Sequence, residues 1–405
     1  MAGTDDVVDE AERADCKISR CVREGRYDLL VRLEPAEGER PPQLTKGPMV
    51  EELKKLLERM AEAGMASGNR WPISDTELGR AATCYRRASI FLEVRMERPQ
   101  LDLDLPEGGL PREEDVRTLL EAAPWYTTAG TKDGATRRPR PVDLALFKHA
   151  AVYFIFFQAE KYRIFRTSPK VIHAIDGELS WIEGQVKTAL GYVDADTSML
   201  GLRGLLALQR GRLARALGGQ HLEEAEQCLT NAIGFYEARA EKSRGGGSKG
   251  AQHYLVSSSF RAAGAILQGS YLSHLRGQLG RAAHNLKTAR LLALYTENEV
   301  LQSEIELVKR SVQIAALKPA DIARGDPAET GKLEGIVASL QDVLELNRLY
   351  QRDVYVMMTT YLLALCDMYA APTVDGGESR ALRRADELHS LALHDRAGGE
   401  SSEPA

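Results

Sequence analysis

The stretch Leu217–Ile233, LGGQHLEEAEQCLTNAI, decides the fold of this chain. After a Gly-Gly turn, it spaces four residues by three, four and three positions: Leu222, Ala225, Leu229 and Ala232. Because an α-helix turns once every 3.6 residues, these side chains lie on one stripe of a helix. Small alanines let a neighbouring helix approach closely, and the large residue between them fills the space beside that contact. The stretch therefore predicts a helix packed tightly against another helix.

The same spacing occurs three more times in the chain. The further stripes are Leu78/Ala81/Tyr85/Ala88, Leu279/Ala282/Leu286/Ala289 and Leu382/Ala385/His389/Ala392. A recurring stripe of this kind is typical of helical hairpins that stack on one another, because one hairpin cannot bury its apolar face alone. We expect all four stripes to be buried between helices.

Composition agrees with an all-α protein. The 405 residues exceed what one compact core usually holds, so we expect two lobes or one extended array. Hydrophobic residues make up 43% and charged residues 27%, as in ordinary folded proteins. Long runs of β-branched residues are absent, so the sequence does not favour a β-sheet.

Charge and hydropathy point to a cytoplasmic protein. The net charge of −5 argues against bulk attraction to nucleic acid or to an anionic membrane. The acidic N-terminus lacks the features of a secretion signal. The most apolar run, 150–157, is far shorter than the roughly 20 residues of a membrane span, so it predicts a buried helix. The Ala-, Arg- and Gly-rich usage indicates a GC-rich bacterial source.

The cysteines and histidines form no recognisable metal or catalytic motif. The five cysteines are scattered without a CxxC pair, which predicts buried free thiols. His389 and His394 are five residues apart, the wrong spacing for one helical face. No nucleotide-binding or hydrolase motif occurs, and Gly245–Gly250 reads as a linker. We therefore expect no cofactor, no metal and no catalytic residue.

The chain is expected to contain four parts. An N-terminal helical segment spans 1–123, a basic Pro/Gly loop spans 124–142, a helical array spans 143–395, and a disordered tail spans 396–405. The array is predicted to contain helices over 143–166, 169–192, 197–217, 220–242, 252–276, 278–294, 298–316, 331–349, 351–370 and 379–395, with a connecting stretch at Lys318–Thr330.

The two central stripes, in LGGQHLEEAEQCLTNAI and RGQLGRAAHNLKTAR, resemble the second helices of tetratricopeptide (TPR) repeats. Gly25-Arg26-Tyr27 resembles the turn between helices of that family. The stripes are 57 residues apart, however, whereas that repeat spans roughly 34. The resemblance implies a degenerate TPR-like α-solenoid with long irregular helices, whose first helices line a groove for a peptide or protein partner. An ordinary irregular helix bundle is the alternative.

Candidate binding residues lie on the two predicted first helices. The proposed partner-binding set is Arg203, Arg210, Arg215, Arg261, Gln268, Tyr271 and His274. Arginine forks suit carboxylates and phosphates, so the arginines predict a groove for an acidic segment. The plainer interpretations are a solvated helix side, with Arg210 paired to Glu223 or Glu224, and core packing for the second helix.

A second candidate is the basic loop, whose cations are Lys132, Arg137, Arg138 and Arg140. It predicts a site for an anionic ligand, although it lacks the interleaved aromatics of nucleic-acid sites.

These observations favour a non-enzymatic scaffold or regulatory adaptor that binds a protein segment in a groove. One alternative is a helical sensor of a small anionic ligand or nucleic acid. The other is an enzyme with an unrecognised helical active site.

Overall fold

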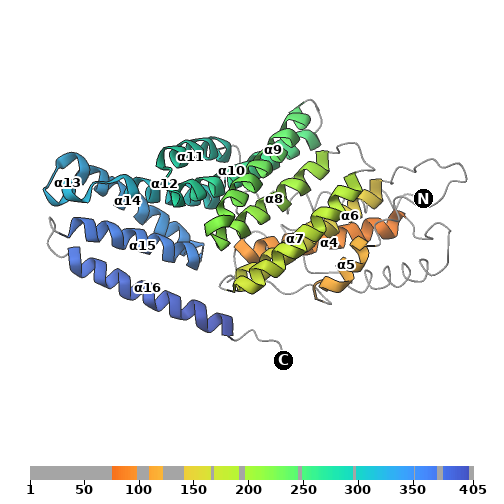
Figure 1. The fold of residues 1–405 in the computed structure, drawn as a ribbon, viewed down its shortest axis with the longest axis horizontal. Coiled ribbons are helices and arrows are strands. Elements are labelled where there is room, and N and C mark those ends of the chain that lie inside the picture. The colour runs from red at the N-terminus through yellow and green to blue at the C-terminus, as the bar shows by residue number, and fades with distance from the viewer. Residues whose placement is uncertain are drawn as a thin grey trace, which may run out of the picture. The chain divides into compact units, whose positions relative to one another are not determined.

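The computed structural model describes residues 75–97, 109–121, 141–165, 168–190, 197–244, 249–294, 298–350, 352–371 and 377–400. Within these ranges 92% of the residues are helical, in 13 α-helices, and no strand occurs (Figure 1). The predicted all-α class is confirmed for this part of the chain.

Two compact units make up the chain, Met1–Arg261 and Ala262–Ala405. The division falls inside helix α10 (Lys249–Leu275), where the sequence did not predict a boundary. Helices that precede and follow the basic loop in the sequence pack together within the first unit: α4 (Asp75–Glu97) contacts α6 (Pro141–Phe165). The loop thus connects two parts of one unit.

In the first unit, α6 is the central helix. It contacts α4, α5, α7 and α8, so its apolar residues meet neighbours on several sides. The remaining elements are α5 (Glu113–Glu121), α7 (Pro169–Leu190), α8 (Thr197–Leu217), the short 3-10 helix η2 (Gly219–His221) and α9 (Leu222–Arg244). These bounds agree with the predicted helices to within about two residues.

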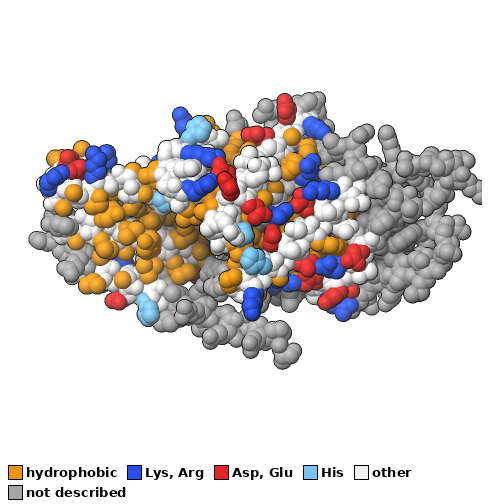
Figure 2. All heavy atoms as spheres, in the orientation of Figure 1, with side chains coloured by type: hydrophobic (Ala, Val, Ile, Leu, Met, Phe, Trp, Pro, Cys, Tyr) orange, Lys and Arg blue, Asp and Glu red, His pale blue; other side chains and the backbone are white. Residues whose placement is uncertain are grey.

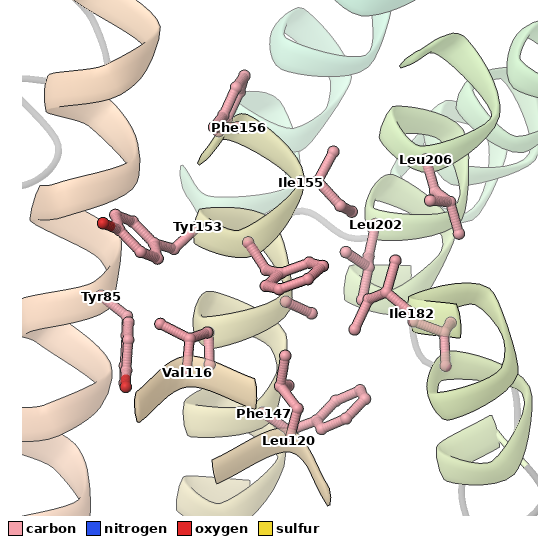
Figure 3. Packing of buried hydrophobic residues seen from close by; sticks show 14 of the residues in the cluster. Tyr85, Val116, Leu120, Phe147, Tyr153, Ile155, Phe156, Ile182, Leu202 and Leu206 are labelled. Carbon is pink, nitrogen blue, oxygen red and sulfur yellow. The ribbon is translucent and has the colours of Figure 1, made fainter. Parts of the chain in front are cut away.

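The core around α6 is built from aromatic and aliphatic side chains of α4, α5, α6, α7 and α8 (Figure 3). Tyr85 of α4 and Tyr153 of α6 are fully buried, and their ring centroids lie 5.9 Å apart. The Tyr153 hydroxyl donates a hydrogen bond of 2.7 Å to the carbonyl of Pro111, which fixes the entry to α5. Val116 and Leu120 of α5 join the same cluster. The predicted buried aromatic helix is confirmed.

The apolar character of α6 also bears on a membrane interpretation. By length and composition alone, Val142–Tyr162 could cross a membrane, and it is the one such segment among the described residues. Of its most apolar window, 56% is buried inside the protein, as is usual for a core helix. This segment is therefore weak support for a membrane span.

The α8–α9 hairpin shows how the stripe in Leu217–Ile233 works. Gly218 and Gly219 form the turn with φ angles of 67° and 52°, a backbone that favours glycine. Ala225 and Ala232 of α9 are completely buried. Gly204 of α8 faces this seam, and a Cβ atom there would lie 2.7 Å from the Tyr236 ring. Both partners therefore contribute small residues to the close contact.

The second unit consists of helices that mostly pack against neighbours in the chain. After the end of α10 come α11 (Leu279–Ala293), α12 (Glu299–Ala316), α13 (Pro319–Ala323), α14 (Pro327–Leu349), α15 (Asp353–Ala370) and α16 (Gly377–Glu400). Contacts join α11 to α12, α12 to α14, α14 to α15 and α15 to α16. Gly277, with a φ of 70°, forms the turn between α10 and α11.

Two predictions about helix ends in this unit are wrong. The connecting stretch Lys318–Thr330 contains α13 and the first turn of α14. Asp326 caps α14 by accepting a 2.8 Å hydrogen bond from the backbone N–H of Ala328, and Pro327 follows at the first helical position. At the other end, α16 continues to Glu400, so residues 396–400 of the predicted tail are helical.

In three of the four alanine stripes, both alanines and the large residue between them are buried as expected, with Leu222 and Leu279 half-buried at the start of their stripes; the fourth stripe is exposed. On α16, Leu382 is 61% exposed, and Ala385 and His389 are also exposed. The physical reason is that α16 contacts α15 through its other face, where Arg380 and Arg384 form ion pairs with Asp367. Residues two and five positions after Arg380 lie roughly opposite that face, so the stripe points outward. The spacing rule was therefore wrong for the last helix.

Candidate partner-binding surface

Arg203 and Arg210 lie on α8 as predicted, but both contact neighbouring helices. The Arg203 guanidinium carbon lies 4.1 Å from the ring centroid of Phe235 on α9. Arg210 meets three carboxylates, at 3.4 Å from Asp176, 2.7 Å from Glu183 and 3.2 Å from Glu224. The charge of Arg210 is thus neutralised within a network that joins α7, α8 and α9. Its contact with Glu224 is the pairing that the solvated-helix interpretation predicted.

The other two predicted arginines are also involved in packing. Arg261 forms an ion pair with Glu93 of α4, and its guanidinium lies 5.5 Å from the Phe260 ring centroid. Arg215 is half-buried near the end of α8. All four arginines therefore lie in the first unit, where ion pairs, ring contacts or burial already occupy much of each side chain.

Gln268, Tyr271 and His274 belong to the second unit. Gln268 is buried, and Tyr271 and His274 are half-buried. The Nε2 atom of His274 lies 3.1 Å from the Ser311 hydroxyl of α12, and burial lowers the pKa of His274. These contacts fit the packing interpretation of α10. The predicted set of seven residues is divided between the two units.

The predicted anionic-ligand loop is not part of the described structure. Lys132, Arg137, Arg138 and Arg140 lie outside the described residues, so their grouping stays a prediction.

A different surface, on α15, has the features of a binding site. Five apolar residues follow one another at steps of four, three, four and three: Val354, Met358, Tyr361, Leu365 and Met368. We call this set the α15 outer stripe. Its first, third and fifth members are 38%, 54% and 60% exposed, and the other two are half-buried. The stripe runs about 21 Å along the helix, at roughly 1.5 Å per residue.

The α15 outer stripe lies opposite the side of α15 that faces the core. Val356 and Leu363 are buried with α14 residues in the core of this unit, and both lie about half a turn away from Tyr361. A helix that is apolar on both sides is normally covered on both sides. Among the described residues, α15 packs against α14 and α16, and Met358 and Leu365 of the stripe touch the core at its edge. Val354, Tyr361 and Met368 remain exposed, so the outer stripe is a partly open apolar surface.

The electrostatics of this surface are simple because α15 carries almost no charge. Asp353 and Asp367 are its only charged residues. Asp367 is buried, with its two carboxylate oxygens 3.3 Å and 2.7 Å from the Nε atoms of Arg380 and Arg384. Figure 2 shows hydrophobic side chains gathered over α14 and α15 with few charged atoms among them. Apolar patches of this kind mark interaction sites on protein surfaces.

The sequence contained a signal for this surface that was missed. The predicted helix 351–370 has apolar residues on its two opposite sides and no Lys, Arg or Glu between Asp353 and Ala370. Such a helix needs cover over both apolar sides, but only a structure can show that its two neighbours, α14 and α16, leave the outer stripe open. The sequence predictions instead followed the arginines, because a cation is easier to recognise than an uncovered face.

The described residues offer little to metal or acid–base chemistry. Among them, no group of three or more His, Cys, Asp or Glu could hold a metal ion. Cys84 and Cys366 are buried free thiols, and Cys228 is a half-buried one. Burial raises the pKa of Cys228, which opposes formation of a reactive thiolate.

Comparison with known proteins adds no assignment. No protein-family model matches the chain, and neither a curated protein nor a solved structure is detectably similar to it. The function proposed below is therefore inferred from the geometry of this chain alone.

Proposed function

We propose that this protein is a non-enzymatic adaptor that binds an amphipathic helix of a partner protein along the α15 outer stripe. The observation that carries the proposal is an uncharged stripe of five apolar side chains, three of them exposed, on the open side of a core helix. Binding would remove this apolar area from water, which is the main source of affinity at such surfaces.

The spacing of the stripe favours a helix as its partner. Alternating steps of four and three residues repeat on average every 3.5 residues, the period with which two helices keep apolar seams in contact. A β-strand presents side chains with a period of two and matches such a row poorly. Met358 and Met368 are flexible thioethers that adapt to irregular partner surfaces.

The helix packing supports the TPR-like α-solenoid as part of this proposal. In the first unit α7 contacts α8 and α8 contacts α9, and in the second unit α14, α15 and α16 pack in succession. Neighbour-on-neighbour packing is what helical repeats use to present an extended binding surface. The 57-residue separation of the two central stripes makes the repeat irregular.

The alternative of an anionic ligand on α8 has less support. Arg210 already contacts three carboxylates, and Arg203 stacks on an aromatic ring. An incoming phosphate or carboxylate would have to displace these contacts. We therefore place partner recognition on α15 and not in an arginine-lined groove.

The proposal is tested by placing charge on the stripe. In the double variant Tyr361→Glu/Met368→Glu, two carboxylates would have to be desolvated in the complex, which is unfavourable without a partner charge. The matched control is Leu291→Glu on α11, where a leucine of similar exposure, 55%, lies outside the stripe. The tagged proteins are used for affinity capture from a native extract, and the binding segment of each captured protein is mapped by hydrogen exchange.

The proposal predicts that the wild type and the Leu291→Glu variant retain the same partner through a helical segment, and that the double variant loses it. Retention by the double variant would contradict the proposal, as would a partner bound through an extended segment. Light scattering on the purified proteins measures their molar mass and so tests whether the chain self-associates. A dimer that the double variant abolishes would assign the stripe to a second copy of this chain instead.

A further inference from the structure

A pocket of about 480 Å³ lies in the first unit, between α5, the end of α6 and the start of α7. Small-molecule sites usually have volumes of roughly 300–1,000 Å³, so the pocket has the size of a ligand site. Three carboxylates and three cations line it in equal number: Glu113, Glu114 and Glu178 with Arg117, Lys161 and Lys170. The pocket therefore has no net formal charge but strong local charges of both signs.

On the α6 side of the pocket, the Glu113 carboxylate accepts hydrogen bonds from two side chains. Its carboxylate oxygens accept hydrogen bonds of 2.5 Å from the Gln158 amide and 2.5 Å from the Lys161 ammonium. Lys161 also lies 5.1 Å from the Phe157 ring centroid, which holds its cation against α6. One carboxylate thus ties the start of α5 to the end of α6.

Gln158 has an acceptor without a donor. Its side chain is fully buried and lines the pocket, yet its Oε1 atom accepts no hydrogen bond. An ionised carboxylate only accepts hydrogen bonds, so Glu113 requires the amide nitrogen of Gln158 to face it. The amide oxygen must then point away from Glu113. A buried acceptor left unpaired costs free energy, and a ligand N–H or ammonium would satisfy it.

On the α7 side, the pocket holds an accessible cation. Arg117 forms an ion pair with Glu178 and stacks 4.4 Å from the Trp181 ring centroid, so its charge is engaged. Lys170 is exposed and makes no ion pair with a described residue. It lies in the first turn of α7, where the helix dipole also favours a negative group.

The wall between these two sides is apolar. Val171, Ala174 and Ile175 line the pocket along α7, with Ile175 buried in the core of the unit. This wall could take a small aliphatic group but would leave a charged one unsolvated.

From this arrangement we infer that the pocket binds a small zwitterion, an aliphatic amino acid or a short aliphatic peptide. The ligand ammonium donates to the Gln158 Oε1 atom beside Glu113, and the ligand carboxylate meets Lys170 at the start of α7. The aliphatic side chain lies on the wall formed by Val171, Ala174 and Ile175. This site is separate from the α15 outer stripe and would stand if the adaptor proposal failed.

Calorimetric titration of the intact chain tests the inference with four probes. L-Leucine and the dipeptide Leu-Leu carry both charges, whereas 3-methylbutylamine lacks the carboxylate and 4-methylpentanoate lacks the ammonium. A hydrogen bond to a charged group changes affinity by about tenfold or more. We expect at least one zwitterion to bind and both half-ligands to bind about tenfold more weakly. A preference between leucine and the dipeptide identifies which zwitterion is the better ligand.

Two variants separate the two ends of the site. Lys170→Glu, an exposed change, should weaken zwitterion binding about tenfold and leave 3-methylbutylamine binding unchanged or stronger. Gln158→Met keeps the shape of the side chain but removes its amide, so zwitterion binding should fall while 4-methylpentanoate binding stays the same. The matched control is Lys287→Glu on α11, an exposed lysine outside the pocket, which should bind like the wild type.

Three results would overturn the inference. The first is no binding of either zwitterion at millimolar concentration. The second is a half-ligand that binds as tightly as the zwitterions. The third is a Lys170→Glu variant with unchanged zwitterion affinity, and this result stands even if Gln158→Met does not fold.

Discussion

Replacing Gly204 with alanine adds one methyl group to the tight contact between α8 and α9. The new Cβ atom would lie 2.7 Å from two ring atoms of Tyr236, far inside van der Waals contact. Tyr236 is completely buried, so its ring has little room to move away. The substitution therefore forces the two helices apart or strains the ring.

The magnitude follows from two opposing effects. Alanine is favoured over glycine in a helix by about 1 kcal/mol. Overpacking a core by one methyl group costs about 1–3 kcal/mol. The matched control is Gly234→Ala on α9, where a Cβ atom would meet nothing within 4 Å and only the helix preference acts. The preference of alanine over glycine in a helix is the same in both variants and therefore cancels. Gly204→Ala should then be less stable than Gly234→Ala by about 1–3 kcal/mol.

Urea unfolding followed by circular dichroism measures both variants against the wild type. We expect Gly234→Ala to move the midpoint to higher urea concentration and Gly204→Ala to move it lower or leave it unchanged. Equal stabilisation by both substitutions would show that α8 and α9 do not approach closely between Gly204 and Tyr236.

Three further outcomes follow from buried groups. The Arg352 side chain is 2% exposed and forms an ion pair with Glu304. Arg352→Ala should lower the unfolding free energy, measured by urea unfolding, by about 3–5 kcal/mol, because the Glu304 carboxylate is left buried without its partner. A loss below about 1 kcal/mol would refute the pairing. Burial raises the pKa of the Cys366 thiol to about 12, so peptide-level mass spectrometry should find it alkylated only after unfolding, and rapid labelling of the native protein would contradict this. Burial, with Lys148 and Arg86, holds the pKa of His149 well below its usual range, so the unfolded chain binds the extra proton below about pH 6.5. The unfolding free energy should then fall as the pH decreases from 7 to 5, less steeply in His149→Gln, and an unchanged slope in that variant would exclude His149 as the cause.

Local patterns in the sequence were enough to predict most helices. The Gly218-Gly219 turn and the stripe after it predicted the α8–α9 hairpin, because glycine and the 3.6-residue period act within a few residues of one another. What the pattern did not show was the partner side of the seam. Gly204 lies far from the stripe in sequence, and a glycine inside a helix normally indicates weakness rather than a packing contact.

The fourth stripe shows where the pattern is ambiguous. Leu382 and Ala385 have the same spacing as the buried stripes, but α16 also carries Arg380 and Arg384 on its other side. Their ion pairs with Asp367 orient the helix, and the alanine side is left in water. An apolar stripe predicts a helix reliably, but it predicts burial only when no other face of that helix binds its neighbour better.

The candidate sites depended on tertiary contacts that the sequence could not show. Arg210 was a candidate for partner binding, with pairing to Glu223 or Glu224 as the alternative, and it lies among carboxylates from α7 and α9 that include Glu224. The pocket beside Gln158 combines residues from three helices, so no single stretch of sequence contains its pattern. Tyr361 is a site candidate only because nothing described covers it.

Site-specific photocrosslinking tests the proposed function most directly. A photoreactive phenylalanine analogue replaces Tyr361 in one protein and Leu291 in the control, and crosslinked residues are identified by mass spectrometry from native extract. We predict that position 361 crosslinks to the apolar side of an amphipathic helix in a partner protein, and that position 291 does not. Equal crosslinking from both positions, or none from position 361, would contradict a binding role for α15.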